Sequence, residues 1–200
     1  MTSGLGILHR EMAYRKQHVH ALQLWLNLPA ESKMVEPSYK DIRADKVPVR
    51  RESGVEIRVF SGRSGNIEAI PKVSKYVPVT LLDIRLDGSI GVHDNDWTTF
   101  TQEIPGDEGF VYVISGQAYF SSKRTSVSAG QVGHLAHSST TDGRTTLSVL
   151  AKKPTRFLLW TGKPLRQPVV ARGPFVMNTE NQIANAFEDY RTGLFGLRPA

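Results

Sequence analysis

The chain has 200 residues, of which 40% are hydrophobic and 22% charged, so its composition is that of a globular protein and excludes the disordered and fibrous classes. It contains no cysteine, which excludes a disulfide, a thiolate metal site and a thiol nucleophile. The formal charge of +6 is spread over separated basic pairs (Arg50-Arg51, Lys123-Arg124 and Lys152-Lys153) without a nucleic-acid-binding motif, so we do not expect direct sequence-specific nucleic-acid binding.

His9 and Glu11, near the start of the chain, are two residues apart. If residues 6–12 form a strand, both side chains point to the same face. An imidazole and a carboxylate can hold two neighbouring positions on a first-row transition metal such as Fe(II), and open positions would leave room for O₂ or a substrate. Because a His-x-Glu triplet is also common by chance, the alternative is an exposed pair or a packed histidine.

His18 and His20 have the same spacing. Across a hairpin from His9 and Glu11 they would complete a set of three histidines and one carboxylate, which suits mononuclear iron. In a strand they would lie on the same face as the alternate leucines of residues 22–26, because even numbers of residues separate them. The alternative is therefore that these histidines pack beside a row of core leucines. Geometry, not sequence, decides between these two interpretations.

A proline-containing segment, residues 29–49, predicts an irregular crossover between two structural halves. Beyond it, residues 55–59 and 82–86 alternate apolar and charged side chains, which predicts strands with one face on a core and the other in water. Further short strands are expected at residues 147–150 and 157–160. Many short strands separated by turns favour a sandwich or a barrel.

An unbroken apolar run at residues 110–114 predicts a strand that is buried on both faces. Ser115-Gly116 follows it, and residues 118–120 come next, so we expect a hairpin at this turn.

The remaining histidines are weaker candidates for a functional site. His134 and His137 are three residues apart, which places strand side chains on opposite faces. His93 precedes Asp94-Asn95-Asp96, residues that more often form turns than bind a cation. No nucleophile elbow, phosphate loop or pair of catalytic carboxylates is apparent.

Near the C-terminus, Thr179 and Gln182 have the spacing of a capping box, in which the two side chains satisfy backbone N–H groups at a helix start. Apolar residues follow at helical spacing, and Gly193 can end the helix in the left-handed conformation. We therefore predict an amphipathic helix over residues 180–192 that packs on the β structure.

Several longer stretches resemble the pirin family of the cupin superfamily. The run that ends in His9-Arg10-Glu11-Met12 resembles the stretch carrying the family's His-x-Glu-Met metal motif. Residues 23–37 resemble the segment that follows, and residues 162–169 and 173–179 resemble the C-terminal signature. Together these motifs bracket nearly the whole chain.

This resemblance implies an all-β fold of two cupin-type (jelly-roll) β-barrels with a C-terminal α-helix, the first barrel being incomplete because the chain begins within it. We accordingly expect a remnant of the N-terminal barrel plus the crossover at residues 1–48. The C-terminal barrel would occupy residues 49–165, and an extension with the helix residues 166–200.

Pirins hold one iron ion with three histidines and one glutamate, and by the resemblance His9 and Glu11 match the last two ligands. The other two belong to a His-x-His motif upstream of this point. His18 and His20 follow the glutamate, so they do not match that motif, and His20 matches a strand site near the pocket. We therefore expect a weakened metal site, together with an exposed sheet edge and apolar face.

The function implied by the resemblance is that of an iron-linked regulatory protein, a transcription cofactor of the nucleus and cytoplasm that binds a transcription factor of the Rel type. The chain has no signal-peptide-like or membrane-spanning run, which agrees with an intracellular protein. The alternative is a metal-dependent flavonol (quercetin) 2,3-dioxygenase, in which Glu11 is both ligand and base for the flavonol hydroxyl. Whether the chain is an enzyme therefore remains open at this point.

Overall fold

The computed structural model describes residues 1–12, 19–69, 76–88, 97–105, 108–135 and 144–197. The chain divides into two compact units. Unit 1 comprises Met1–Asp41 and Leu165–Ala200, and unit 2 comprises Ile42–Pro164. The domain boundaries expected at residues 48/49 and 165/166 remain predictions.

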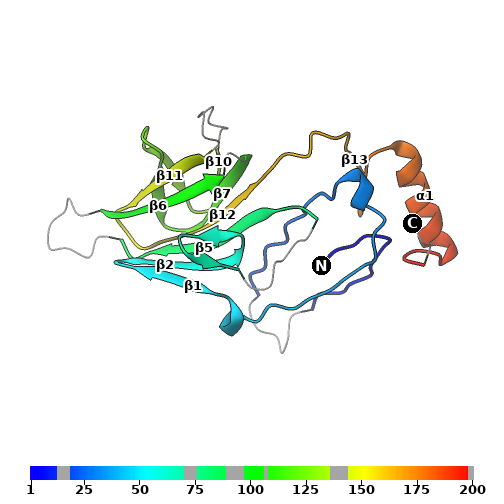
Figure 1. Cartoon of the computed structure of the whole chain (residues 1–200), viewed down its shortest axis with the longest axis horizontal. Coiled ribbons are helices and arrows are strands. Elements are labelled where there is room, and N and C mark those ends of the chain that lie inside the picture. The colour runs from blue at the N-terminus through cyan, green and yellow to red at the C-terminus, as the bar shows by residue number, and fades with distance from the viewer. Residues whose placement is uncertain (13–18, 70–75, 89–96, 106–107, 136–143, 198–200) are drawn as a thin grey trace. The chain divides into compact units, whose positions relative to one another are not determined.

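The described residues form mostly strands, with one α-helix near the C-terminus (Figure 1). In chain order the strands are β1 (Val49–Glu52), β2 (Val55–Ser61), β3 (Arg63–Ser64), β4 (Ile67–Glu68), β5 (Val79–Leu86), β6 (Thr98–Pro105), β7 (Glu108–Ser115), β8 (Gln117–Phe120), β9 (Thr125–Ser128), β10 (Val132–Leu135), β11 (Arg144–Ala151), β12 (Thr155–Gly162), β13 (Val170–Arg172) and β14 (Phe175–Met177). The helices are the 3₁₀ turns η1 (Ala30–Ser32) and η2 (Ala44–Lys46), and α1 (Glu180–Thr192). The prediction of an all-β fold with a C-terminal α-helix is confirmed.

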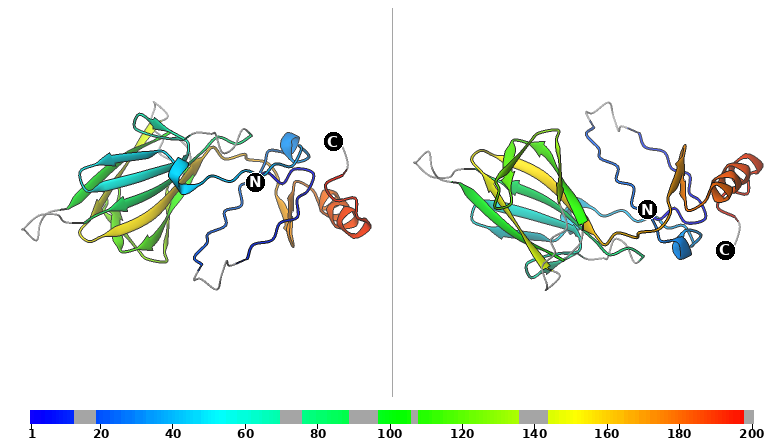
Figure 2. Two further views of the ribbon diagram at one scale, coloured as in Figure 1. Left: turned by 90° about the horizontal axis from the view of Figure 1, so that it is seen from below. Right: turned by 90° about the horizontal axis from the view of Figure 1, so that it is seen from above.

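Unit 2 is built around two facing sheets (Figures 1 and 2), with β3 and β4 forming a separate small hairpin. The larger sheet has the strand order β1-β2-β5-β12-β7-β10, and the smaller has the order β6-β11-β8-β9. All pairings within the two sheets are antiparallel. Because consecutive strands repeatedly change sheet, the chain builds the jelly-roll-type barrel that the resemblance implies.

The core of unit 2 lies between these sheets. Alternate residues of β2 and β12 are buried, as the period-two pattern predicts. Phe157 of β12 meets Phe120 of β8 edge to face across the core, with ring centroids 5.3 Å apart. Both rings are almost completely buried, so together they join the two sheets through apolar contact.

Two expectations for β7 need correction. Val111 and Val113 are buried but Phe110, Tyr112 and Ile114 are only partly buried, so this strand is not buried on both faces. It also forms no hairpin with β8, because β7 pairs with β12 and β10 whereas β8 pairs with β11 and β9. Gly116 carries the chain from one sheet to the other with φ of 79°, and a Cβ there would overlap the carbonyl oxygen of Pro154.

A charged pair lies on the outer face of the larger sheet. Arg156 of β12 donates two hydrogen bonds to Asp83 of β5, from Nε to Oδ1 at 2.9 Å and from Nη2 to Oδ2 at 2.8 Å. Asp83 is only 3% exposed, although the alternating pattern predicted that this face of β5 would be in water. The hydrogen bonds to the carboxylate raise the pKa of Arg156, so the guanidinium stays charged.

Unit 1 contains the antiparallel hairpin of β13 and β14, packed beside α1 (Figure 2). The predicted helix over residues 180–192 and its capping box are both confirmed, since Gln182 N donates to Thr179 Oγ1 at 3.2 Å and Gln182 Oε1 accepts from Thr179 N at 3.0 Å. Gly193 ends the helix with φ of 77°.

Aromatic side chains hold the hairpin, the helix and the segment after it together. Phe175 of β14 meets Phe187 of α1 edge to face at 4.9 Å and also contacts Phe195 at 5.6 Å. Tyr190 of α1 contacts Phe195 at 5.9 Å.

A buried lysine connects two distant parts of unit 1. Lys33 is only 5% exposed, and its Nζ donates to Asn27 Oδ1 at 2.6 Å and to the carbonyl of Val176 in β14 at 3.2 Å. Burial lowers the pKa of this amine, because the charged form loses water. No carboxylate among the described residues pairs with it.

The N-terminal part of unit 1 differs from the predicted one. Residues 6–12 are not a strand, so the expectation of a strand there is wrong. The leucines of residues 22–26 are more than 40% exposed, so they do not form a core stripe. The crossover predicted at residues 29–49 is irregular, containing η1, η2 and a single bridge between Thr2 and Ser38 before β1 begins.

Among the described residues, no helix is long and apolar enough to cross a membrane.

Candidate functional site

The segment that leads to His9 and Glu11 is anchored along residues 35–38. Thr2 and Ser38 exchange two backbone hydrogen bonds of 2.8 and 3.0 Å, and Leu5 N donates to the carbonyl of Val35 at 2.9 Å. Gly6, with φ of 138°, brings the backbone against the ring of Phe195 at a distance that a side chain would not allow. The chain therefore leaves a fixed point at Gly6 and enters the region of the two predicted ligands.

His9 and Glu11 lie on the same side of this segment. Nδ1 of His9 is 3.5 Å from Oε1 of Glu11, although residues 6–12 do not form the strand from which this proximity was expected. Both are open to solvent, with side-chain exposures of 37% and 72%. An exposed pair of this kind contributes little to stability, because water screens the charges. The described pair is thus the exposed pair that the sequence analysis gave as the alternative, and the metal role of His9 and Glu11 stays a prediction.

Tyr39 and Asp41 add a phenol and a second carboxylate near Glu11. A hydrogen bond to the Asp41 carboxylate and its negative charge raise the pKa of Tyr39, with smaller contributions from desolvation and the charge of Glu11. Tyr39 therefore lies within electrostatic range of both carboxylates. No sequence pattern links these residues to Glu11, since about thirty positions separate them in the chain.

The other predicted histidines do not complete the set in the part of the chain that is described. His20 is exposed, and His134 is exposed on β10 in unit 2. His18, His93 and His137 lie outside the described residues. Within the described ranges, no group of three or more histidine, aspartate or glutamate side chains could hold a metal ion.

Comparisons with known proteins place the chain among close relatives. Residues 91–196 match the family described as "Pirin C-terminal cupin domain". Over 203 aligned residues the chain is 36% identical to "Pirin" of Homo sapiens, covering 100% of this chain and 65% of the human protein. It is also 36% identical to a putative pirin-like protein of Arabidopsis thaliana, covering 100% of this chain and 70% of that protein.

A similar solved structure is quercetin 2,3-dioxygenase from Acinetobacter baumannii. The TM-score is 0.73 at 28% sequence identity, and the match covers 86% of this chain and 55% of that one. The chain thus spans a little over half the length of this enzyme and just under two thirds of the human relative.

Proposed function

The chain belongs to the pirin family of cupin proteins, and from this premise we propose that it acts as an iron-linked regulatory binding protein, a transcription cofactor of the nucleus and cytoplasm. The observation that carries the proposal is the convergence of His9 Nδ1 and Glu11 Oε1 at 3.5 Å on an open segment. In the family resemblance these positions are two of the four iron ligands.

The donor types suit iron, but the described donors fit only part of a mononuclear site. An imidazole and a carboxylate are ligands that Fe(II) accepts. Two donors hold an ion more weakly than four, because each missing ligand removes a bond and part of the fixed geometry. When bound, iron would be held by His9 and Glu11 and would supply a positive charge between them.

The surroundings of these donors support the proposed regulatory role. Leu8 and Met12, which flank the pair, are 75% and 72% exposed. Holding an ion would restrict residues 9–11 and so change how these apolar side chains are presented to a transcription factor of the Rel type. The exposed side chains Phe187 and Tyr190 of α1 offer a second contact for such a partner.

The test is iron binding by the purified chain under anaerobic conditions. We expect Fe(II) to bind, and His9→Ala and Glu11→Gln each to weaken the binding at least about tenfold. His134→Ala is the matched control, because His134 is also exposed but lies on β10 in unit 2. Equal iron content in the His9→Ala and His134→Ala variants would overturn the assignment of His9.

Dioxygenase activity is the second candidate, supported by the likeness to quercetin 2,3-dioxygenase. In this case Glu11 would be a ligand and would also accept the proton of a flavonol hydroxyl. The measurement is O₂ uptake with loss of quercetin absorbance by the iron-loaded chain. Turnover that Glu11→Gln abolishes and His134→Ala retains would support it. Iron binding without any O₂ uptake would eliminate this candidate and leave the first intact.

Localisation and partner are tested separately. We expect the tagged chain in both nucleus and cytoplasm by fluorescence microscopy. We further expect no preference for any DNA sequence in a selection from random duplexes, because the proposed partner is a protein.

A further inference from the structure

The outer face of the smaller sheet in unit 2 carries a fixed aromatic pair. Trp97, directly before β6, meets Tyr119 of β8 edge to face, with ring centroids 5.2 Å apart and an interplanar angle of 79°. The Tyr119 hydroxyl donates to Gln117 Oε1 at 3.3 Å. Gln117 Nε2 in turn donates to the hydroxyls of Ser126 and Ser128 on β9. The pair is therefore held in place from two strands.

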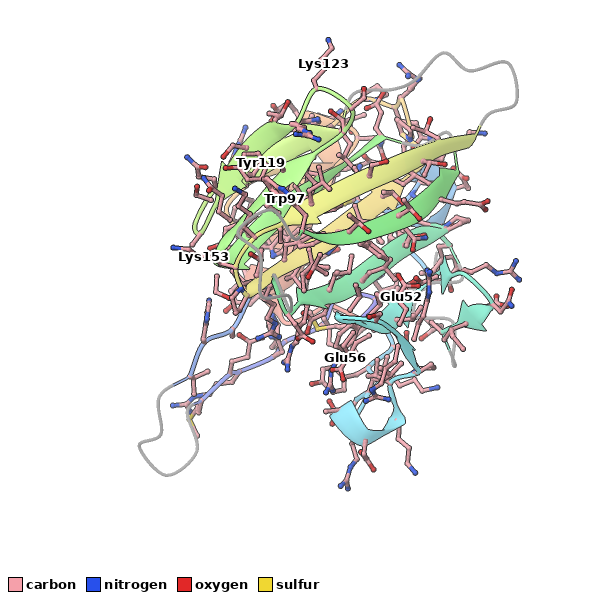
Figure 3. The ribbon with its side chains drawn as sticks, turned by 90° about the vertical axis from the view of Figure 1, so that its left-hand side faces the viewer. Glu52, Glu56, Trp97, Tyr119, Lys123 and Lys153 are labelled. Atoms are coloured by element: carbon pink, nitrogen blue, oxygen red, sulfur yellow. The ribbon has the colours of Figure 1, made fainter. Side chains whose placement is uncertain are left out.

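One cation from each of two basic pairs that are distant in sequence lies over this aromatic pair. Lys152 Nζ lies 4.8 Å from the centroid of the Trp97 ring, and Arg124 Cζ lies 6.0 Å from it. Both are cation–π distances. Figure 3 shows Lys123 and Lys153, their sequence neighbours, projecting outward on either side of Trp97 and Tyr119. We name the four cations with Trp97 and Tyr119 the basic-aromatic face.

These cations differ from several arginines of unit 2, although Lys46, Arg85 and Lys163 are also exposed without an ion pair to a described residue. Arg50, Arg51, Arg58 and Arg156 each have a carboxylate partner within 3.2 Å. Lys123, Arg124, Lys152 and Lys153 form no ion pair with any described residue, and all four are exposed. The positive charge of the basic-aromatic face is thus open to a partner.

The nearest carboxylate on the same face of β6 is far from these cations. Glu103 has the same strand parity as Trp97 but lies six residues further on, a distance of about 20 Å along a strand. The outward positions between them are Thr99 and Thr101, both exposed. The face therefore has a cationic end and a hydroxyl-rich surface beside it. Asp94 and Asp96 lie outside the described residues.

The turn between β8 and β9 has an unusual backbone. Ser121 and Arg124 both have positive φ, of 64° and 52°. This conformation costs energy in residues other than glycine. Arg124 of this turn has its guanidinium over the Trp97 ring, so a cation already lies at the face before a partner binds.

We propose that the basic-aromatic face is a docking site for an acidic polypeptide segment. Charge complementarity carries the choice of an anionic partner. The Trp97 ring already has cations over it, so it is not a bare platform for stacking nucleic-acid bases. An acidic peptide needs only the cations and the hydroxyl-rich surface. None of these residues belongs to unit 1, so the inference goes beyond the iron-linked role proposed above.

The experiment is fluorescence anisotropy of a labelled Glu/Ser-rich peptide, titrated with the whole chain at about 50 and about 300 mM salt. We expect binding that weakens with salt. Lys152→Gln should lower the affinity about two- to fivefold. Arg124→Asn should act similarly, since asparagine tolerates the positive φ. The matched control is Lys163→Gln, which removes one exposed unit 2 charge elsewhere.

The outcomes separate this inference from its alternatives and from the iron proposal. Equal loss of affinity in Lys152→Gln and Lys163→Gln would show that only net charge matters, and would overturn the docking site. So would an oligothymidylate of equal charge that binds more tightly than the peptide and loses its affinity in Lys152→Gln. Iron binding should be the same in wild type and Lys152→Gln, so a failure of either proposal can be told from a failure of the other.

Discussion

Units 1 and 2 are stabilised in different ways. In the described residues all buried hydrophobic side chains but one belong to unit 2, the exception being Ile183 of α1. Conversely, every large hydrophobic side chain that is strongly exposed lies in unit 1, apart from Val132 of β10. Unit 2 therefore rests on core packing. Unit 1 rests on a helix cap, aromatic edge contacts and the hydrogen bonds of Lys33.

Core packing is concentrated in unit 2, whereas the candidate metal ligands lie in unit 1. A packed barrel can carry surface charges at fixed positions, because its strands do not depend on them. The segment with His9 and Glu11 has no such support beyond Gly6, so a ligand could change its conformation at little cost.

The largest expected effect is in the core of unit 2. Phe157→Ala should lower the free energy of unfolding by about 3–5 kcal/mol, because it leaves a cavity opposite Phe120. Urea unfolding followed by hydrogen exchange of β5, β7 and β12 measures this loss. Val132→Ala, at a 59% exposed site, should change stability by less than about 0.5 kcal/mol. A loss below about 1 kcal/mol for Phe157→Ala would contradict the reliance of unit 2 on packing.

Two glycines with nearly the same φ provide a matched comparison of the units. Gly116→Ala should cost about 3 kcal/mol, since a left-handed alanine is strained and its Cβ would also overlap the Pro154 carbonyl. Gly193→Ala should cost only about 1 kcal/mol, because nothing lies within 4 Å of its added Cβ. Thermal unfolding of both variants, with helix content as a readout for unit 1, measures the difference. Equal costs would mean that the surroundings of Gly116 do not matter.

The smallest effect concerns ionisation in unit 1. The pKa of Tyr39 should lie above its ordinary value of 10.0, so its proton favours the folded state. This contribution is present below pH 10 and is lost as the pH rises through the raised pKa. Asp41→Asn should lower the pKa of Tyr39 more than Glu11→Gln does, because the hydrogen bond to Asp41 is its main cause. An NMR titration of ¹³C-labelled tyrosine, assigned with Tyr39→Phe, measures the pKa of Tyr39 in each variant. A larger effect of Glu11→Gln would contradict this order.

Local patterns in the sequence predicted those strands and the helix whose formation depends on neighbouring residues. Alternation located β2 and β5, and the spacing of Thr179 and Gln182 located α1 to the residue. The hairpin at Gly116 was wrong because a turn residue does not reveal which sheet the chain enters next. That choice depends on contacts with distant strands.

The candidate sites were equally hard to predict, because local patterns do not show which distant residues lie together. The two-residue spacing predicted that His9 and Glu11 converge, although the strand assumed for them is absent from residues 6–12. Tyr39 and Asp41 could not be linked to Glu11 from sequence, because only the fold brings residues 35–38 beside the N-terminal segment. Likewise, Arg124 and Lys152, which look unrelated in sequence, both lie over the Trp97 ring because β8, β9 and β11 share a sheet.

The Asp83–Arg156 pair has a consequence for how the barrel forms. If β12 slipped by one position against β5, Arg156 would turn toward the apolar interior and leave the Asp83 carboxylate shielded from water without a counter-charge. Such a misaligned sheet would carry a penalty that the correct one does not. One ion pair can thus disfavour the wrong strand register during folding. Valines, leucines and isoleucines cannot do this, because they can replace one another in the core.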